Sequence, residues 1–90
     1  MPSVQQVCEI VNAKGLHVRA ATLVAQLAGT FDSNVTIEHA GERANAKSIM
    51  NLLLLTAPMG ASVRITADGD DADAALKAIV DLIQNGFGES

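Results

Sequence analysis

Two short stretches in which apolar and polar residues alternate place the strongest constraint on the fold of this chain. Residues 34–39 set Val35 and Ile37 between polar neighbours, and residues 61–67 do the same with Val63, Ile65 and Ala67. Because successive side chains of a strand point to opposite faces, each stretch predicts a strand with one apolar face. Sheets that are buried on one face only are typically antiparallel. We therefore expect an antiparallel sheet with all of its helices on one side.

Apolar residues at helical spacing predict two helices to cover that sheet. One spans residues 18–28 and stops at Gly29, and the other lies near the end of the chain and stops at Gly86. The turn at 68–71 is rich in aspartate, which favours the positive end of the helix that follows. The apolar stripe of the last helix consists of Leu76, Ile79, Val80 and Ile83.

The remaining segments predict two further strands and a short helix. Residues 4–11 are rich in strand-forming residues, and 43–46 return from a turn at Ala40-Gly41-Glu42. Ser48 is the expected N-cap of a compact apolar helix over residues 49–55. The predicted order is therefore β-α-β-β-α-β-α, and nothing divides residues 1–90 into more than one domain.

Composition excludes several classes of function. The chain has no Trp or Tyr and only two Phe, so we expect an aliphatic core. A formal charge of −4 disfavours a nucleic-acid partner, which would normally require a basic face. Cys8 is the only cysteine, so a disulfide within the chain is impossible, and we interpret it as a buried, inert thiol. The sequence shows no signal peptide and no apolar run long enough to span a bilayer, so we expect a cytoplasmic protein without membrane association.

The stretch Gly15-Leu16-His17-Val18-Arg19-Ala20-Ala21 carries the chemistry. A glycine turn delivers a histidine to the first residues of the helix predicted over 18–28. The free N–H groups of a first helical turn and the helix dipole form a ready anion site. A neutral imidazole is a nucleophile, and Arg19 is a phosphate-binding group two residues on. The arrangement is the one expected if His17 itself carries a phosphoryl group, with Arg19 stabilising it.

These residues resemble the HPr family, the histidine-containing phosphocarriers of the phosphoenolpyruvate-dependent phosphotransferase system. Asn12, Gly15-Leu16-His17 and Arg19 fit the family's active-site turn, and Ala46-Lys47-Ser48-Ile49-Met50 fits its second signature. The resemblance covers essentially the whole chain. It implies an α+β, open-faced two-layer sandwich, with a four-stranded antiparallel sheet and three helices on one face.

The resemblance also implies a role and partners. Enzyme I, charged by phosphoenolpyruvate, would phosphorylate His17, and enzyme IIA-type domains of sugar transport or a regulatory counterpart would take the group away. The protein would be a phosphoryl relay rather than a turnover enzyme. In many relatives a dedicated kinase also phosphorylates the serine that matches Ser48. A monomer is the default for a carrier that meets several partners in turn.

Several other residues are expected to serve this site. The backbone amides of Val18 and Ala20 are candidates to bind the phosphoryl oxygens, and Lys14 and Lys47 to add a positive field. The short helix has too many apolar residues to bury them all, so we expect part of it to remain exposed as a partner-binding patch. The expected partner-binding residues are Lys47, Ile49, Met50 and Leu53.

Three departures from the family pattern affect the expected partners more than the fold. Ala20 stands where the family usually has a proline, and Val18 where it commonly has an alanine. The predicted helix over 18–28 carries no lysine. Weaker basic character would slow association with acidic partners more than it would abolish recognition. Ala20 supplies a backbone donor that proline lacks but loosens the first turn.

Two alternative functions remain open from the sequence. In the first, the chain is a regulatory HPr-like binding module that acts through the surface of Ser48, Ile49, Met50 and Leu53, with phosphorylation of His17 vestigial. In the second, a ligand-sensing domain shares only the fold. The sequence contains no glycine-rich nucleotide loop and no metal-ligand cluster, so neither a cofactor nor a metal is expected. No second acid–base residue is expected near His17, which disfavours an ordinary enzyme active site.

Overall fold

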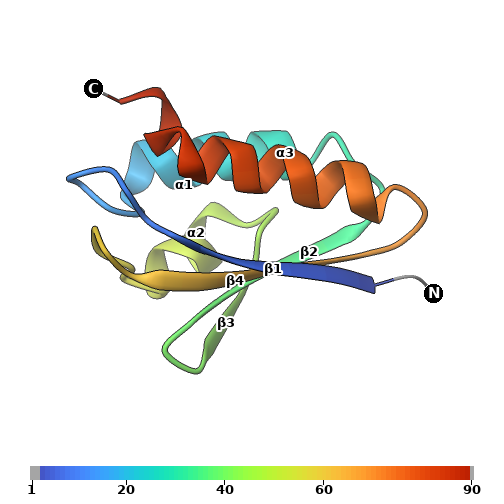
Figure 1. Cartoon of the computed structure of the whole chain (residues 1–90), viewed down its shortest axis with the longest axis horizontal. Coiled ribbons are helices and arrows are strands. Elements are labelled where there is room, and N and C mark those ends of the chain that lie inside the picture. Colours follow the sequence, from blue (N-terminus) through green and yellow to red (C-terminus); the bar gives the residue numbers. More distant parts are fainter. Residues whose placement is uncertain (1–2, 90) are drawn as a thin grey trace.

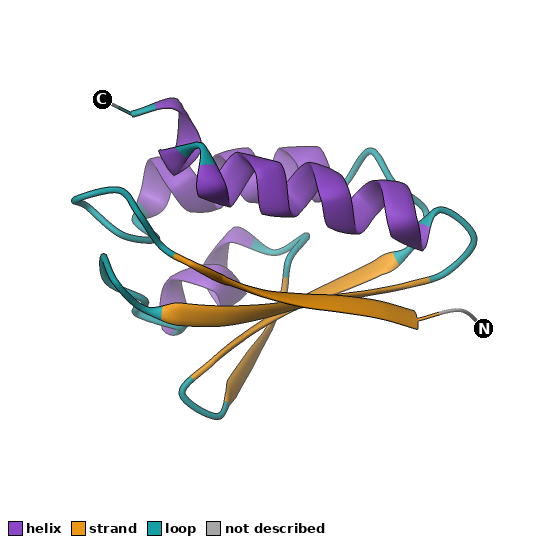
Figure 2. Ribbon diagram, in the orientation of Figure 1, coloured by secondary structure: helices purple, strands orange, loops and turns teal. Residues whose placement is uncertain are grey.

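The computed structural model describes residues 3–89 and has the predicted order of elements. The strands are β1 (Ser3–Glu9), β2 (Asn34–His39), β3 (Glu42–Asn45) and β4 (Ser62–Asp68), and the helices are α1 (Val18–Ala28), α2 (Ile49–Leu54) and α3 (Ala72–Gln84). A 3₁₀ turn, η1 (Gly86–Gly88), follows α3. Figures 1 and 2 show the three helices on one side of the sheet, as predicted. Where the bounds of elements differ from those predicted, they differ by one or two residues.

The four strands form one antiparallel sheet in the order β1-β4-β2-β3. The predicted alternation sets the register, because apolar residues pair on the covered face. Ile37 of β2 lies opposite Ile65 of β4, and Cys8 of β1 lies opposite Val63 of β4. All four side chains are buried. Burial raises the pKa of the Cys8 thiol, which agrees with the expected inert cysteine.

The core is aliphatic with one exception that the sequence analysis did not anticipate. Phe87 is only 2% exposed and is the largest of the fully buried side chains among residues 3–89. It lies in η1 with a φ of 57°, a left-handed conformation that is unfavourable for a bulky residue. The free energy gained by burying the aromatic ring of Phe87 exceeds the cost of its left-handed backbone conformation. The buried Phe87 therefore fixes the path of the chain after α3.

Asp71, in the aspartate-rich turn expected to favour the start of the last helix, is the N-cap residue of α3 and also joins two parts of the chain. Asp71 precedes the helix, but its side chain makes no capping hydrogen bond to it. Its carboxylate instead accepts hydrogen bonds from the backbone N–H of Asp32 and from the N–H and hydroxyl of Ser33. These bonds join the loop after α1 to the start of α3 and lower the pKa of Asp71. Asp71 is thus the N-cap residue of α3 by position, and its side chain makes a tertiary contact in place of a capping hydrogen bond.

Candidate functional site

The loop before α1 has only one residue type that fits at position 15. Gly15 has a φ of +66°, and a Cβ atom there would lie 2.5 Å from the carbonyl oxygen of Ala57 and 2.9 Å from Cα of Pro58. The backbone N–H of Leu16 donates to that same carbonyl oxygen at 2.9 Å. The segment after α2 therefore fixes the loop and places His17 at the start of α1.

His17 is the N-cap residue of α1 and has an extended backbone. Its carbonyl accepts the first helical hydrogen bond from Ala21, and its imidazole makes no capping bond. Its side chain is 25% exposed. Val18 and Arg19 are exposed and carry the first N–H groups of the helix. Ala20 is completely buried, so its amide is not open to an anion, contrary to expectation.

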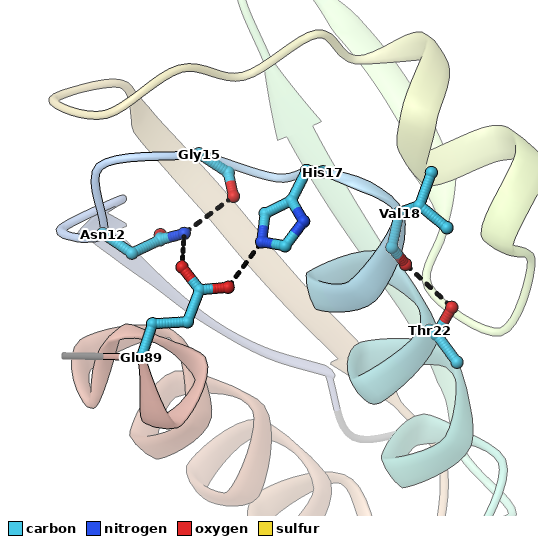
Figure 3. A network of polar contacts seen from close by, with 6 residues as sticks. All are labelled: Asn12, Gly15, His17, Val18, Thr22 and Glu89. Carbon is cyan, nitrogen blue, oxygen red and sulfur yellow. Dashed lines mark hydrogen bonds and ion pairs between the residues drawn. The ribbon is translucent and has the colours of Figure 1, made fainter.

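A carboxylate that the sequence analysis missed lies against the imidazole. Oε2 of Glu89 is 2.5 Å from Nε2 of His17, and Oε1 accepts a hydrogen bond from the Asn12 amide at 3.0 Å (Figure 3). The Asn12 amide also donates to the carbonyl of Gly15 at 2.8 Å. The expectation that no second acid–base residue lies near His17 is therefore wrong. Glu89 is 72 residues from His17 in the sequence, and only the buried turn at Phe87 brings it there.

The surroundings of Glu89 favour its ionised form. Hydrogen bonds from the Asn12 amide and from His17 lower the pKa of Glu89, and the positive charge of Lys14, together with that of His17 whenever the ring is protonated, acts in the same direction. Its side chain is 14% exposed. The site therefore contains a carboxylate that is negatively charged at neutral pH, held at two points.

Cationic side chains line a cleft beside this network. The cleft has a volume of about 660 Å³, and Asn12, Lys14, Arg19, Met59 and Glu89 are among the residues that line it. Arg19 makes no ion pair among residues 3–89, so its guanidinium is available to an incoming anion. Lys14 and Arg19 therefore line the same cleft as Glu89, the carboxylate that contacts His17, while His17 is not among the residues that line it.

Lys47 does not belong to this group. Its ammonium donates to the carbonyl of Phe31 at 2.9 Å, just beyond the C-terminal end of α1. His17 caps the other end of the same helix, which is about 16 Å long at 1.5 Å per residue. Lys47 therefore adds little to the field at His17, contrary to the expectation for that residue.

The short helix α2 exposes apolar side chains, although not the ones expected in every case. Met50 is 70% exposed and Ile49 is 36% exposed, whereas Leu53 is half-buried against the core. Leu54 is 74% exposed and was not among the candidate residues. Ser48 is the N-cap of α2 as predicted, and its hydroxyl accepts a hydrogen bond from the N–H of Asn51.

Comparison of the sequence with known proteins identifies the family of this chain. Residues 4–85 match the family model described as "PTS HPr component phosphorylation site". The chain is 44% identical to the phosphocarrier protein HPr of Cupriavidus necator over 89% of this chain and 90% of that one. It is 41% identical to the phosphocarrier protein NPr of Shewanella violacea over 100% of this chain and 99% of that one.

Solved structures agree with these sequence matches. The crystal structure of HPr-C-His from Thermoanaerobacter tengcongensis has a TM-score of 0.92 and 42% identity, and the match covers 97% of this chain and 98% of that one. The crystal structure of an HPr dimer from the same organism matches with a TM-score of 0.77 and 45% identity, over 91% and 94% of the two chains.

The fold and the histidine turn define a phosphocarrier of the phosphotransferase system. The chain belongs to the HPr family. No helix within residues 3–89 is long and apolar enough to cross a membrane. In that same range the structure contains no group of three or more His, Cys, Asp or Glu side chains that could hold a metal ion.

Proposed function

We propose that His17 is the phosphoryl acceptor of this chain, that enzyme I is its donor, and that enzyme IIA-type domains take the group away. The observation that carries the proposal is the position of the imidazole. It is partly exposed at the N-terminus of α1, beside a cleft that Arg19 and Lys14 line. Membership of the HPr family supports the same role.

The site suits a reaction that requires alignment and charge stabilisation. The transferred phosphoryl group passes through a loose, highly charged transition state, so the protein's task is to orient and stabilise it. Arg19 supplies a cation, and the N–H groups of Val18 and Arg19 supply donors at the positive end of the helix dipole. Ala20 is buried and has no direct part.

The exposed apolar side chains of α2 are the proposed docking surface for these partners. Met50, Ile49 and Leu54 are exposed on a helix that packs against α1, which His17 caps. Leu53 contributes from a half-buried position, and Lys47 borders this surface. A cluster of solvent-exposed apolar side chains on one surface favours association with another protein. We propose a monomeric, single-domain carrier, although the T. tengcongensis HPr dimer shows that a relative can pair.

Ser48 is a proposed regulatory phosphorylation site for a serine kinase. A phosphate there would lie at the N-terminus of α2, where the helix dipole favours negative charge. It would add about two negative charges beside the docking surface without unfolding the helix. We expect weaker association with acidic partners as a result.

A second candidate function is a regulatory binding module in which the α2 surface acts and phosphorylation of His17 is dispensable. The replacement of the family's proline by Ala20 favours it. This alternative predicts that His17→Ala retains partner binding and biological activity, while Ser48→Asp changes both. Unchanged binding by the Ser48→Asp variant would count against it.

The intact mass of the protein after incubation with enzyme I, phosphoenolpyruvate and magnesium tests the proposed acceptor. We expect an acid-labile gain of one phosphoryl group that is absent from the His17→Ala variant. The preparation of enzyme I is first shown to phosphorylate another HPr. No gain by this chain would then refute the proposed donor and favour the binding module.

A further inference from the structure

Sulfur is divided between the core and the surface of this protein. Within residues 3–89 it belongs to Cys8, Met50 and Met59. The Cys8 thiol is buried and burial raises its pKa, so it is a poor target for oxidants. The thioethers have the opposite setting, because Met50 is 70% exposed and Met59 is 58% exposed. Oxidants in solution therefore reach the two methionines far more readily than the cysteine.

Met50 lies where a change in polarity has the largest effect on association. It is in the first turn of α2, and Leu54, four residues on, shares its side of the helix and is 74% exposed. Ile49 adds a further exposed apolar side chain, and α2 contains no charged residue. The docking surface proposed above therefore depends on the burial of apolar side chains, and Met50 is one of the two most exposed among them.

We propose that Met50 is a reversible oxidation site, and that its sulfoxide disables the docking surface of α2. The inference rests on the proposed docking function of that surface. A lone pair of Sδ attacks one oxygen of hydrogen peroxide, the O–O bond breaks, and the sulfoxide forms as water leaves. The sulfur loses two electrons, and the peroxide gains them. A thiol-dependent sulfoxide reductase reverses the step, because two thiols become a disulfide and the oxygen leaves as water.

The sulfoxide opposes docking because it turns an apolar side chain into a polar one. Its oxygen is hydrated on the free protein, and an apolar partner surface that covers α2 must remove that water without replacing its hydrogen bonds. The fold is affected little, since most of the Met50 side chain is already in solvent before oxidation. Oxidation of Met50 therefore acts on association with partners rather than on stability.

Met59 provides an internal comparison for Met50. It lies outside α2, in the segment before β4, and lines the cleft together with Asn12, Lys14 and Arg19. A sulfoxide at this position has polar and cationic side chains nearby, which can donate hydrogen bonds to its oxygen. We therefore expect oxidation of Met59 to have the smaller effect on docking.

Separate oxidation of the two methionines tests the proposal. The wild type, Met50→Leu and Met59→Leu are treated with hydrogen peroxide, which is removed before enzyme I is added. Leucine keeps an apolar side chain of similar volume but has no sulfur to oxidise. We expect peptide mass mapping to find one added oxygen on Met50 and on Met59 wherever each is present. Relative to the untreated protein, kcat/KM for phosphorylation by enzyme I should fall by about tenfold or more in the wild type and in Met59→Leu, and by no more than about twofold in Met50→Leu.

Two further measurements decide the origin of the loss. If docking is weakened and the chemistry is intact, KM rises while kcat and the thermal midpoint are retained. Methionine sulfoxide reductase with a dithiol should restore both the original mass and kcat/KM.

Four results would overturn the proposal: Met50 that stays unoxidised, an oxidised Met59→Leu variant that keeps its kcat/KM, an equal loss in Met50→Leu, or a loss that the reductase does not reverse. Absence of phosphorylation in the untreated wild type would refute the proposed function instead. The mass map would still decide whether Met50 is a reversible oxidation site.

Discussion

At the scale of single residues, Gly15 has the most restrictive position in the site. It combines a left-handed φ with a close approach to the backbone at Ala57 and Pro58. Gly41 has a similar φ of +84° but nothing within 4 Å of the place a Cβ would occupy. The two glycines therefore separate the effect of backbone conformation from the effect of crowding.

Gly15→Ala is predicted to destabilise the protein more than Gly41→Ala does. We expect the left-handed backbone alone to cost about 1 kcal/mol in either variant, and displacement of the loop to add a further ~1–2 kcal/mol in Gly15→Ala. Urea denaturation of both variants measures the two free energies of unfolding. Equal losses of stability would mean that the loop does not pack against the segment after α2 as described.

Arg19 is predicted to act on transfer and not on folding. Its side chain is exposed, lines the cleft and makes no ion pair among residues 3–89, so its removal should leave the thermal midpoint unchanged. The rate of phosphorylation by enzyme I should fall by about tenfold or more, because a cation that stabilises the transition state is lost. Single-turnover kinetics measure this rate, with Arg43→Ala on the β2–β3 hairpin as the control. An Arg19→Ala rate equal to that of the control would remove Arg19 from the site.

At the scale of elements, α2 depends on its cap. A six-residue helix has too few internal hydrogen bonds to be stable alone, so the bond from Asn51 N–H to the Ser48 hydroxyl matters. Ser48→Ala should lower the free energy of unfolding by about 0.5–2 kcal/mol. Ser62→Ala, at an exposed position of β4, is the matched control. Chemical denaturation that finds no difference between the two variants would contradict a capping role.

The sequence predicts these elements well because each has a local signal. Alternation at Val35 and Ile37 and at Val63 and Ile65 specifies strands and their buried face, and the register follows from it. The serine before an apolar run specifies the start of α2. Leu54 was missed as an exposed residue because every position of a short apolar helix looks alike when the neighbouring elements are unknown.

The site was predicted only where its residues are adjacent in the chain. His17 and Arg19 belong to one turn, and their proximity follows from local spacing. Glu89 reaches His17 because Phe87 adopts a positive φ to enter the core, and no periodicity in the sequence indicates that conformation. Asp71 is similar, since its partners lie 38 and 39 residues away. Contacts of this kind depend on the packed whole.

At the scale of the whole molecule, hydrogen-bonded carboxylates connect distant parts of the chain and make stability depend on pH. The pKa of Asp71 in the folded protein lies below its ordinary value of 3.8. A depressed folded pKa contributes stability that is fully present above the unfolded value and is lost as the pH falls through the folded value. The bonds to Asp32 and Ser33 therefore weaken on acidification.

We predict that two aspartate variants differ in how their thermal stability changes as the pH falls. Asp71→Asn should be less stable than the wild type at neutral pH, and the gap should narrow as the pH falls below 4. Asp73→Asn, an exposed change on α3, should follow the wild type closely. Thermal midpoints measured from pH 7 to pH 2.5 provide the comparison. A gap that stays constant over this range would contradict the link between the Asp71 charge and the fold.

At the scale of the whole molecule, a phosphoryl carrier must both accept the group and pass it on at one histidine. The most direct measurement follows a labelled phosphoryl group from phosphoenolpyruvate through enzyme I and this chain to a purified enzyme IIA-type domain. We predict that label reaches the IIA domain only when this chain is present, with a labelled His17 intermediate, and that His17→Ala abolishes the relay. A relay that persists with His17→Ala, or label that loads onto His17 and never discharges to any acceptor, would contradict the account.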